Sequence, residues 1–162
     1  MTSDSARTPV RDALGASAAD LLTYLERRIG RQDAPDILSE VMLVAYRRAS
    51  SLPVRPLEAR MWLFGVARNL VLNAERADHR RLRLVDRLKA LPDGSAASAS
   101  DDGADVRDAV QRLGPETAEL VRLIHWEGFS IAEAASILEI SASTARSRYQ
   151  RAKAQLRAEL NL

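Results

Sequence analysis

One polar segment divides this chain of 162 residues into two parts, and it limits the fold more than any other feature. Residues 92–105 are mostly small, polar and acidic, and apart from Pro92 none of their apolar side chains is larger than alanine. Such a segment cannot contribute to a packed core, so it is predicted to be a flexible linker. Residues 9–91 and 106–162 are then two small domains with limited cores. Residues 1–8 are predicted to be a disordered tail.

Both domains are expected to be helical, because apolar residues recur at helical spacing and no segment alternates long enough to indicate a sheet. A first helix carries an apolar stripe from Val10 to Ile29, interrupted around Gly15, and Gly30 ends it. A second helix begins near the cap residue Asp33 and Pro35. A third helix runs from about Leu57 to near Lys89, and four more helices are expected at 104–112, 116–126, 130–137 and 142–159. The predicted fold class is all-α, with two helical domains joined by an acidic linker.

The net charge of +2 hides an uneven distribution. Residues 1–91 hold 16 basic and 11 acidic groups, the linker holds four acidic groups, and residues 106–162 hold eight basic and seven acidic groups. All but two of the 24 basic residues are arginines, whose planar donors suit phosphates and base edges. A GC-rich genome would produce the same excess of arginine, so composition alone leaves both explanations open.

Several classes of protein are disfavoured. The absence of cysteine excludes disulfides, thiol catalysis and cysteine-bound zinc, and two histidines far apart do not indicate a metal site. No carboxylate cluster, phosphate-binding glycine loop or nucleophile–histidine pair is visible, so we expect no catalytic residues, no cofactor and no enzyme activity. No apolar run approaches the ~20 residues that span a bilayer, and no signal peptide is visible, which predicts a cytoplasmic protein.

The C-terminal part has the pattern of a helix-turn-helix. Ser130 and Glu133 form the sequence of a capping box, a turn follows at Glu139, and Ser141 can cap the last helix. From Ser141 onward there are five basic groups and one acid, whereas residues 106–140 hold three basic groups and six acids. Arg146 and Arg151 are candidates for guanine edges, while Ser143, Ser147 and Arg148 are candidates for phosphates. An ordinary helical hairpin with a solvated basic face is the competing interpretation, but the capping box, turn and charge reversal favour DNA binding.

The third helix of the N-terminal part carries a polar stripe formed by Asn69, Asn73, Arg76 and Arg80. Asparagine forms helices poorly, so two of them on one face indicate recognition: amides read unpaired bases and arginines bind the backbone. Alanines and other apolar residues, as far as Ala77, are expected behind the stripe. Aromatic residues at the head of this helix, Trp62 and Phe64, either stack on bases or belong to the core.

These residues resemble a known family. Residues 34–46 (APDILSEVMLVAY) and 61–69 (MWLFGVARN) resemble the second conserved region of bacterial sigma factors. Residues 113–160, including Glu127-Gly128-Phe129-Ser130 and residues 147–153 (SRYQRAK), resemble the fourth region. With only these two regions and a short linker, the chain is similar to the extracytoplasmic-function (ECF, group IV) subclass.

The resemblance implies a subunit that binds core RNA polymerase, through the β′ and β subunits, and directs initiation at specific promoters in the cytoplasm, at the nucleoid. The implied linker path follows the polymerase active-site and RNA-exit channels, and members of the subclass are often held by an anti-sigma factor. The implied polymerase-binding residues are Asp36, Ser39, Glu40 and Leu43. The implied residues for the minus-ten element, which is melted, are Arg68, Asn69, Asn73, Arg76 and Arg80. Those for the duplex minus-thirty-five element are Ser143, Thr144, Arg146, Ser147, Arg148, Gln150 and Arg151.

Three positions depart from the family pattern. Ser39 stands where the family usually has glutamine, and Ala145 replaces a usual valine behind the recognition helix. Glu139 occupies a turn position usually held by glycine, where a left-handed backbone costs about 1 kcal/mol.

Two other functions are weighed against the sigma factor. A stand-alone helix-turn-helix regulator explains the C-terminal part but neither the Asn/Arg stripe nor the linker, and no leucine-rich dimerisation helix is visible. A nucleic-acid enzyme would need the catalytic residues described above, and this sequence does not show them. The carboxylates of Asp101, Asp102 and Asp105 lie in the linker, where nothing fixes their geometry.

Overall fold

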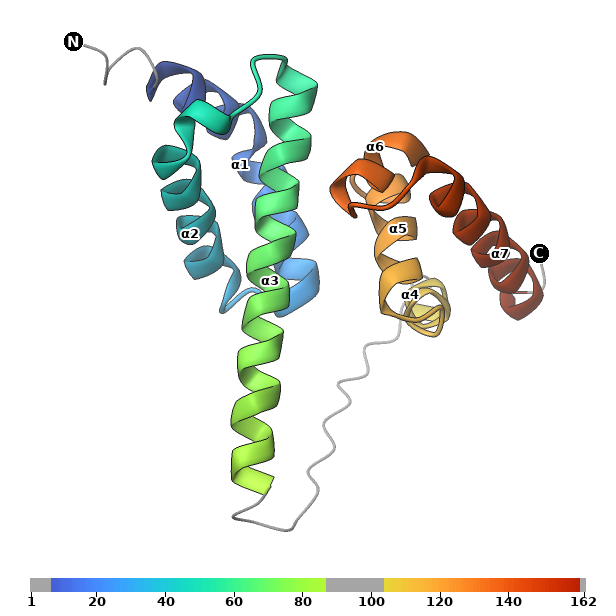
Figure 1. The fold of residues 1–162 in the computed structure, drawn as a ribbon. Helices are drawn as coiled ribbons and strands as arrows, with labels where there is room; N and C mark the ends of the chain where they lie inside the picture. Colours follow the sequence, from blue (N-terminus) through green and yellow to red (C-terminus); the bar gives the residue numbers. More distant parts are fainter. Residues whose placement is uncertain (1–6, 87–103, 161–162) are drawn as a thin grey trace. The chain divides into compact units, whose positions relative to one another are not determined.

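The computed structural model describes residues 7–86 and 104–160, and within these ranges every regular element is a helix (Figure 1). The chain divides into two compact units, one with the first three α-helices and one with the last four. The predicted all-α class is confirmed. None of the helices in the described ranges is both long and apolar enough to span a bilayer.

The N-terminal unit consists of α1 (Arg7–Ile29), α2 (Ala34–Arg47), the short 3₁₀ turn η1 (Ala49–Ser51) and α3 (Pro56–Asp86). Gly30 ends α1 as predicted: its φ is +86°, a left-handed conformation, and its amide donates to the carbonyl of Glu26 at 3.0 Å. Pro35 lies in the first turn of α2, also as predicted. Asp33 is the N-cap residue of α2, as predicted, although its side chain makes no capping hydrogen bond.

The core of this unit forms where the three helices meet. The side chains of Leu21, Leu25, Val41 and Leu63 are fully buried there. The Phe64 ring is also fully buried and meets that of Tyr24 edge to face, with centroids 5.1 Å apart and planes inclined by 72°. Phe64 therefore belongs to the core and is not available to stack on a base.

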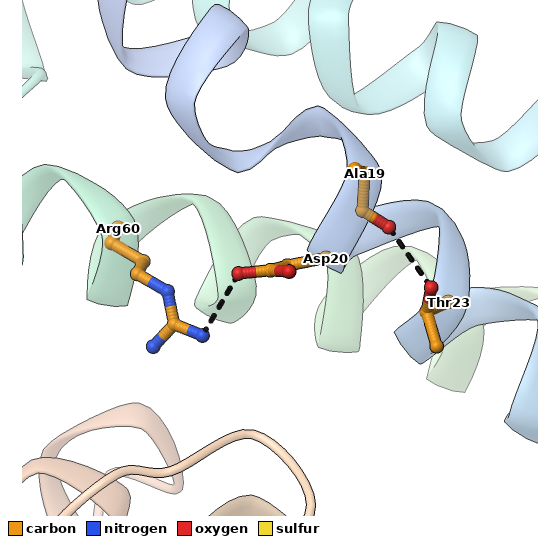
Figure 2. A network of polar contacts seen from close by, with 4 residues as sticks. All are labelled: Ala19, Asp20, Thr23 and Arg60. Carbon is orange, nitrogen blue, oxygen red and sulfur yellow. Dashed lines mark hydrogen bonds and ion pairs between the residues drawn. The ribbon is translucent and has the colours of Figure 1, made fainter.

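A polar contact joins α1 and α3 at the edge of this core. Arg60 Nη2 lies 3.4 Å from Asp20 Oδ2 (Figure 2), and the Arg60 guanidinium is 4.8 Å from the Phe64 ring centre. One turn along α1, the Thr23 hydroxyl donates to the carbonyl of Ala19 at 3.1 Å. The ion pair is partly solvated, so its contribution to stability is about 1 kcal/mol at most.

The bounds of the helices differ from the predicted ones at several places. α1 begins at Arg7, so the last two residues of the predicted tail are helical, and it continues through Gly15 without interruption. A glycine inside a helix costs about 1 kcal/mol, which the packing of a 23-residue helix overcomes. The predicted end of the third helix near Lys89 lies outside the described residues. Ala77, expected behind the polar stripe, is exposed, because α3 extends past α1 and α2 (Figure 1).

The C-terminal unit consists of α4 (Ala104–Gln111), α5 (Pro115–His125), α6 (Ile131–Ile137) and α7 (Ala142–Leu160). These bounds lie within one residue of the expected ones. Ala104 and Asp105, assigned to the linker, are helical; residues 92–103 of the predicted linker lie outside the described residues. The core contains Val110, Ala118, Val121 and Ala152, with Leu113, Tyr149 and Leu156 packed against it.

Polar contacts fix α7 against the helices beside it. Arg112, in the turn after α4, donates through Nε to Glu159 Oε2 at 2.9 Å, and His125 Nε2 of α5 lies 2.9 Å from the Tyr149 hydroxyl. Glu159 also accepts a hydrogen bond from Gln155 at 2.9 Å. The hydrogen bonds from Gln155 and Arg112 hold the pKa of the Glu159 carboxyl below its ordinary value.

Candidate nucleic-acid interface

The helix-turn-helix is fixed by side-chain caps at the start of both of its helices. The Ser130 amide donates to Glu133 Oε2 at 2.8 Å, and the Glu133 amide donates to Ser130 Oγ at 3.2 Å, which completes the predicted capping box of α6. The Ser141 hydroxyl accepts from the Thr144 amide at 3.1 Å and so caps α7. Local sequence therefore determines where both helices begin.

The turn between them is a Schellman motif. Leu138 caps the end of α6, the Ile140 amide donates to the Ala135 carbonyl at 3.0 Å, and the Glu139 amide lies 3.2 Å from the Ser136 carbonyl. Glu139 has a φ of +57°, the left-handed conformation that the sequence predicted at the position where the family has glycine. The turn thus keeps its geometry at the cost of a strained glutamate.

One face of α7 is buried and the opposite face is exposed. Ala145 and Ala152 are buried against the unit. The predicted DNA-contacting residues that lie exposed on the opposite side are Ser143, Arg146, Ser147, Gln150 and Arg151. Thr144 is half-buried, with its hydroxyl 2.8 Å from that of Ser141. The exposed face thus brings two arginines together with small polar side chains that can hydrogen bond to DNA.

Arg148 is placed differently from the other predicted contacts. It lies on the flank of α7 that faces α5, and its side chain is only 28% exposed. Its Nη1 donates to Glu116 Oε2 at 2.7 Å. The guanidinium is therefore engaged within the unit.

The Asn/Arg stripe of α3 lies at the surface. Asn69, Asn73, Arg76 and Arg80 are all exposed, whereas Arg68 is half-buried beside them. From residue 75 to residue 83, α3 is exposed on every side, because neither α1 nor α2 reaches this part of it (Figure 1). The stripe therefore begins over the packed bundle and continues onto a part of α3 that solvent surrounds.

The predicted polymerase-binding residues lie on the outer face of α2. Asp36, Ser39 and Glu40 are exposed, and Leu43 is 54% exposed. The Ser39 hydroxyl donates to the Pro35 carbonyl at 3.0 Å. The face thus combines two carboxylates with one accessible leucine.

Several exposed apolar residues were missed by the sequence reasoning, among them Tyr46 and Val54. Tyr46, three residues after Leu43, is 44% exposed and extends the same face. Val54 is 97% exposed in the loop before α3. The spacing from Leu43 could have identified Tyr46, and the position of Val54 between Pro53 and Pro56 could have identified the loop tip. In residues 7–86 and 104–160, no group of three or more His, Cys, Asp and Glu side chains could hold a metal ion.

Comparisons with known proteins identify the class to which this arrangement belongs. The family model for sigma-70 region 4 matches residues 104–156. ECF RNA polymerase sigma factor BldN of Streptomyces coelicolor is 30% identical over 123 residues, which cover 71% of this chain and 46% of BldN. ECF RNA polymerase sigma factor SigL of Mycobacterium tuberculosis is 30% identical over 148 residues, which cover 88% of this chain and 84% of SigL.

The solved structure of the sigma factor RpoE, in complex with the anti-sigma factor NepR from Bartonella quintana, matches with a TM-score of 0.72 and 23% identity. The match covers 94% of this chain and 96% of that one, and at this identity it shows the shared fold. The two all-α units, one of which contains a helix-turn-helix, have the fold of a sigma factor. The chain belongs to the ECF family of RNA polymerase sigma factors, although it spans less than half the length of BldN.

Proposed function

We propose that this chain binds core RNA polymerase and directs transcription initiation at a specific class of promoters. The observation that carries the proposal is the exposed basic face of α7, presented by a fully capped helix-turn-helix in a chain of the ECF family. In this assignment the predicted domains 9–91 and 106–162 act as sigma regions 2 and 4, and residues 92–105 connect them. The role requires no catalytic step by the chain itself.

The C-terminal unit is proposed to read the duplex minus-thirty-five element. Arg146 and Arg151 are exposed on α7 and are long enough to reach guanine edges in a major groove. Ser143, Thr144 and Ser147 lie in the first two turns of α7 and Gln150 follows one turn later, and they would bind phosphates or further base edges. This division follows the general rule that phosphate contacts position a protein while base contacts specify the sequence.

The N-terminal unit is proposed to hold the melted minus-ten element. Asn69 and Asn73 are exposed one turn apart on α3, with amides that can hydrogen bond to the edges of an unpaired base. Arg76 and Arg80 continue the same stripe and would follow the backbone, with Arg68 beside them. Because Phe64 is buried, base recognition here rests on hydrogen bonds from amides rather than on stacking by that ring.

The outer face of α2 is proposed to bind the polymerase β′ subunit, and the β subunit is proposed as a second partner within the polymerase. Asp36 and Glu40 would pair with basic groups of the polymerase, and Leu43 would enter an apolar site. The solved RpoE structure contains an anti-sigma factor, and we propose such a regulator as a further partner of this chain. The proposed place of action is the cytoplasm, at the nucleoid.

A run-off transcription assay tests the proposal. Purified core polymerase and fragmented genomic DNA are combined with and without the full chain, and with a Leu43→Asp variant that should lose polymerase binding. Specific transcripts that require the wild-type chain and disappear with the variant would support the sigma factor. Tight duplex binding by the chain alone, without specific transcripts, would instead support a stand-alone helix-turn-helix regulator.

A further inference from the structure

A groove of about 450 Å³ lies between α5 and the flank of α7. From α7 it is lined by Arg148, Arg151 and Gln155, and from α5 by Glu116 and Thr117. Arg151 also belongs to the exposed face proposed to contact DNA. The groove therefore adjoins the exposed face that is proposed to contact the minus-thirty-five element.

The strongest polar contact in this groove is the ion pair between Arg148 and Glu116, with Nη1 and Oε2 2.7 Å apart. The Glu116 side chain is 68% exposed, whereas that of Arg148 is 28% exposed. Arg151 differs, because its Nε is 3.5 Å from the Ser147 carbonyl, at the long limit of a hydrogen bond. Of the two arginines in the groove, Arg148 thus has a strong acidic partner.

A DNA phosphate is a better partner for a guanidinium than one oxygen of a solvated carboxylate. Phosphate accepts two parallel N–H bonds from the planar fork of arginine. An exposed ion pair contributes little to stability, so its opening is a small obstacle. The carboxylate that remains beside the groove repels the incoming phosphate, and it therefore opposes binding both by competition and by its charge.

We infer that Glu116 limits the affinity of the promoter interface, because its carboxylate competes with a backbone phosphate of duplex DNA for the guanidinium of Arg148. The inference rests on the proposed function, since it requires α7 to bind a duplex. When the duplex is bound, Arg148 turns to the phosphate and Glu116 remains in solvent. Glu116 thus weakens contacts that are independent of sequence and leaves the base contacts of Arg146 unaffected.

Duplex binding by the full chain tests this inference. The probe is a short fluorescein-labelled duplex of random sequence, and anisotropy gives the affinity between about 50 and 200 mM salt. Glu116→Gln should bind about three- to tenfold more tightly at low salt, and the slope of log K against log salt should steepen by about 0.9, as expected for one phosphate. Glu116→Ala, which cannot hydrogen bond to Arg148, should reproduce the gain.

The same measurement on Arg148→Ala completes a double-mutant cycle. Alone, this change should alter the affinity less than about twofold, since Glu116 already occupies the guanidinium. Combined with Glu116→Gln, it should remove most of the gain and leave only the part that comes from the lost charge of Glu116. A gain that persists in full in the double variant would show that Glu116 acts by charge repulsion alone, which overturns the competition.

Glu159→Gln is the matched control. This substitution removes one negative charge from the same unit. It also removes the acidic partner of Arg112, whose Nε lies 2.9 Å from Glu159 Oε2. At 1.5 Å per residue it lies about 16 Å along α7 from Arg148, beyond the screening length of about 10 Å at 0.1 M salt. Its affinity should change less than about twofold, and an equal gain in this variant would overturn the inference.

The outcomes also separate this inference from the proposed function. If the wild-type chain binds no duplex even at low salt, the inference about Glu116 is overturned, whereas the proposed function is decided separately by run-off transcription with core polymerase. If it binds duplex and supports run-off transcription but Glu116→Gln gains nothing, only the role of Glu116 is overturned.

Discussion

Replacing Glu139 by glycine should stabilise the C-terminal unit. Glu139 has a φ of +57° in the turn between α6 and α7, and the Ile140 amide closes that turn on the Ala135 carbonyl at 3.0 Å. The Glu139 side chain is exposed, so its removal leaves no cavity. The substitution therefore changes the backbone energy of one position and little else.

The magnitude follows from two opposing terms. A left-handed conformation costs an L-residue about 1–2 kcal/mol, which glycine avoids. Glycine loses about 0.5–1 kcal/mol more conformational entropy on folding. The net gain is about 0.5–1 kcal/mol. Because 1 kcal/mol shifts the Tm of a small domain by about 4–8 °C, the Tm of this unit should rise by about 2–8 °C.

Thermal unfolding followed by tryptophan fluorescence can measure this change. The chain has two tryptophans, one in each unit, so a Trp62→Phe background leaves Trp126 as the reporter of the C-terminal unit. Glu139→Ala is the matched control, since it removes the same charge but keeps a Cβ at positive φ. A glycine variant that melts no higher than the alanine variant would refute the argument that this turn is strained.

Four further outcomes are expected. Gly15→Ala should stabilise the N-terminal unit by about 1 kcal/mol, because the site is helical and exposed and a Cβ there meets no atom within 4 Å; urea denaturation read through Trp62 checks this, and an unchanged midpoint would contradict it. The hydrogen bonds from Gln155 and Arg112 lower the pKa of Glu159 in the folded chain. They therefore stabilise the C-terminal unit at pH values above the pKa of Glu159 in the unfolded chain, and this stability is lost as the pH falls through the pKa in the folded chain. Glu159→Gln should therefore weaken the acid dependence of unfolding, measured in denaturant at a series of pH values. Arg146→Ala should cost about 1–3 kcal/mol of promoter discrimination in competition binding while polymerase binding is unchanged. Asn69→Ala should reduce permanganate reactivity of melted promoter bases more than duplex binding, and unaltered reactivity would remove Asn69 from the proposed site.

The helix bounds could be predicted from sequence because most of them depend on local chemistry. Gly30 ends α1 through its own left-handed backbone, and Ser130 and Ser141 begin α6 and α7 through hydrogen bonds to residues three positions ahead. Each of these signals spans only a few residues. Asp33 shows the limit of such reasoning, because a cap residue can stand in the right position without making its bond.

Whether a side chain is exposed depends on which other helices pack against it, and the spacing of apolar residues in the sequence does not reveal those neighbours. The apolar pattern of α3 continues to Ala77, yet burial ends near Val71 and the half-buried Ala74, where the packing surface of α1 and α2 stops. In the same way, the sequence pattern does not distinguish Arg148 from the other basic residues of the recognition helix. Its acidic partner Glu116 comes from 32 residues earlier, and only the packing of α5 on α7 brings them together.

Polar contacts act together with packing to hold the recognition helix. The core beside α7 contains Val110, Ala118, Val121 and Ala152, and the larger side chains of Leu113, Tyr149 and Leu156 pack against it. Contacts to His125 and Arg112 also hold α7, at residues 149 and 159. An arginine that reads a base edge must be placed to within a fraction of an ångström, so loss of one of these contacts should affect promoter selectivity more than global stability. The charged residues around α7 are therefore part of the proposed reading mechanism even where they do not touch DNA.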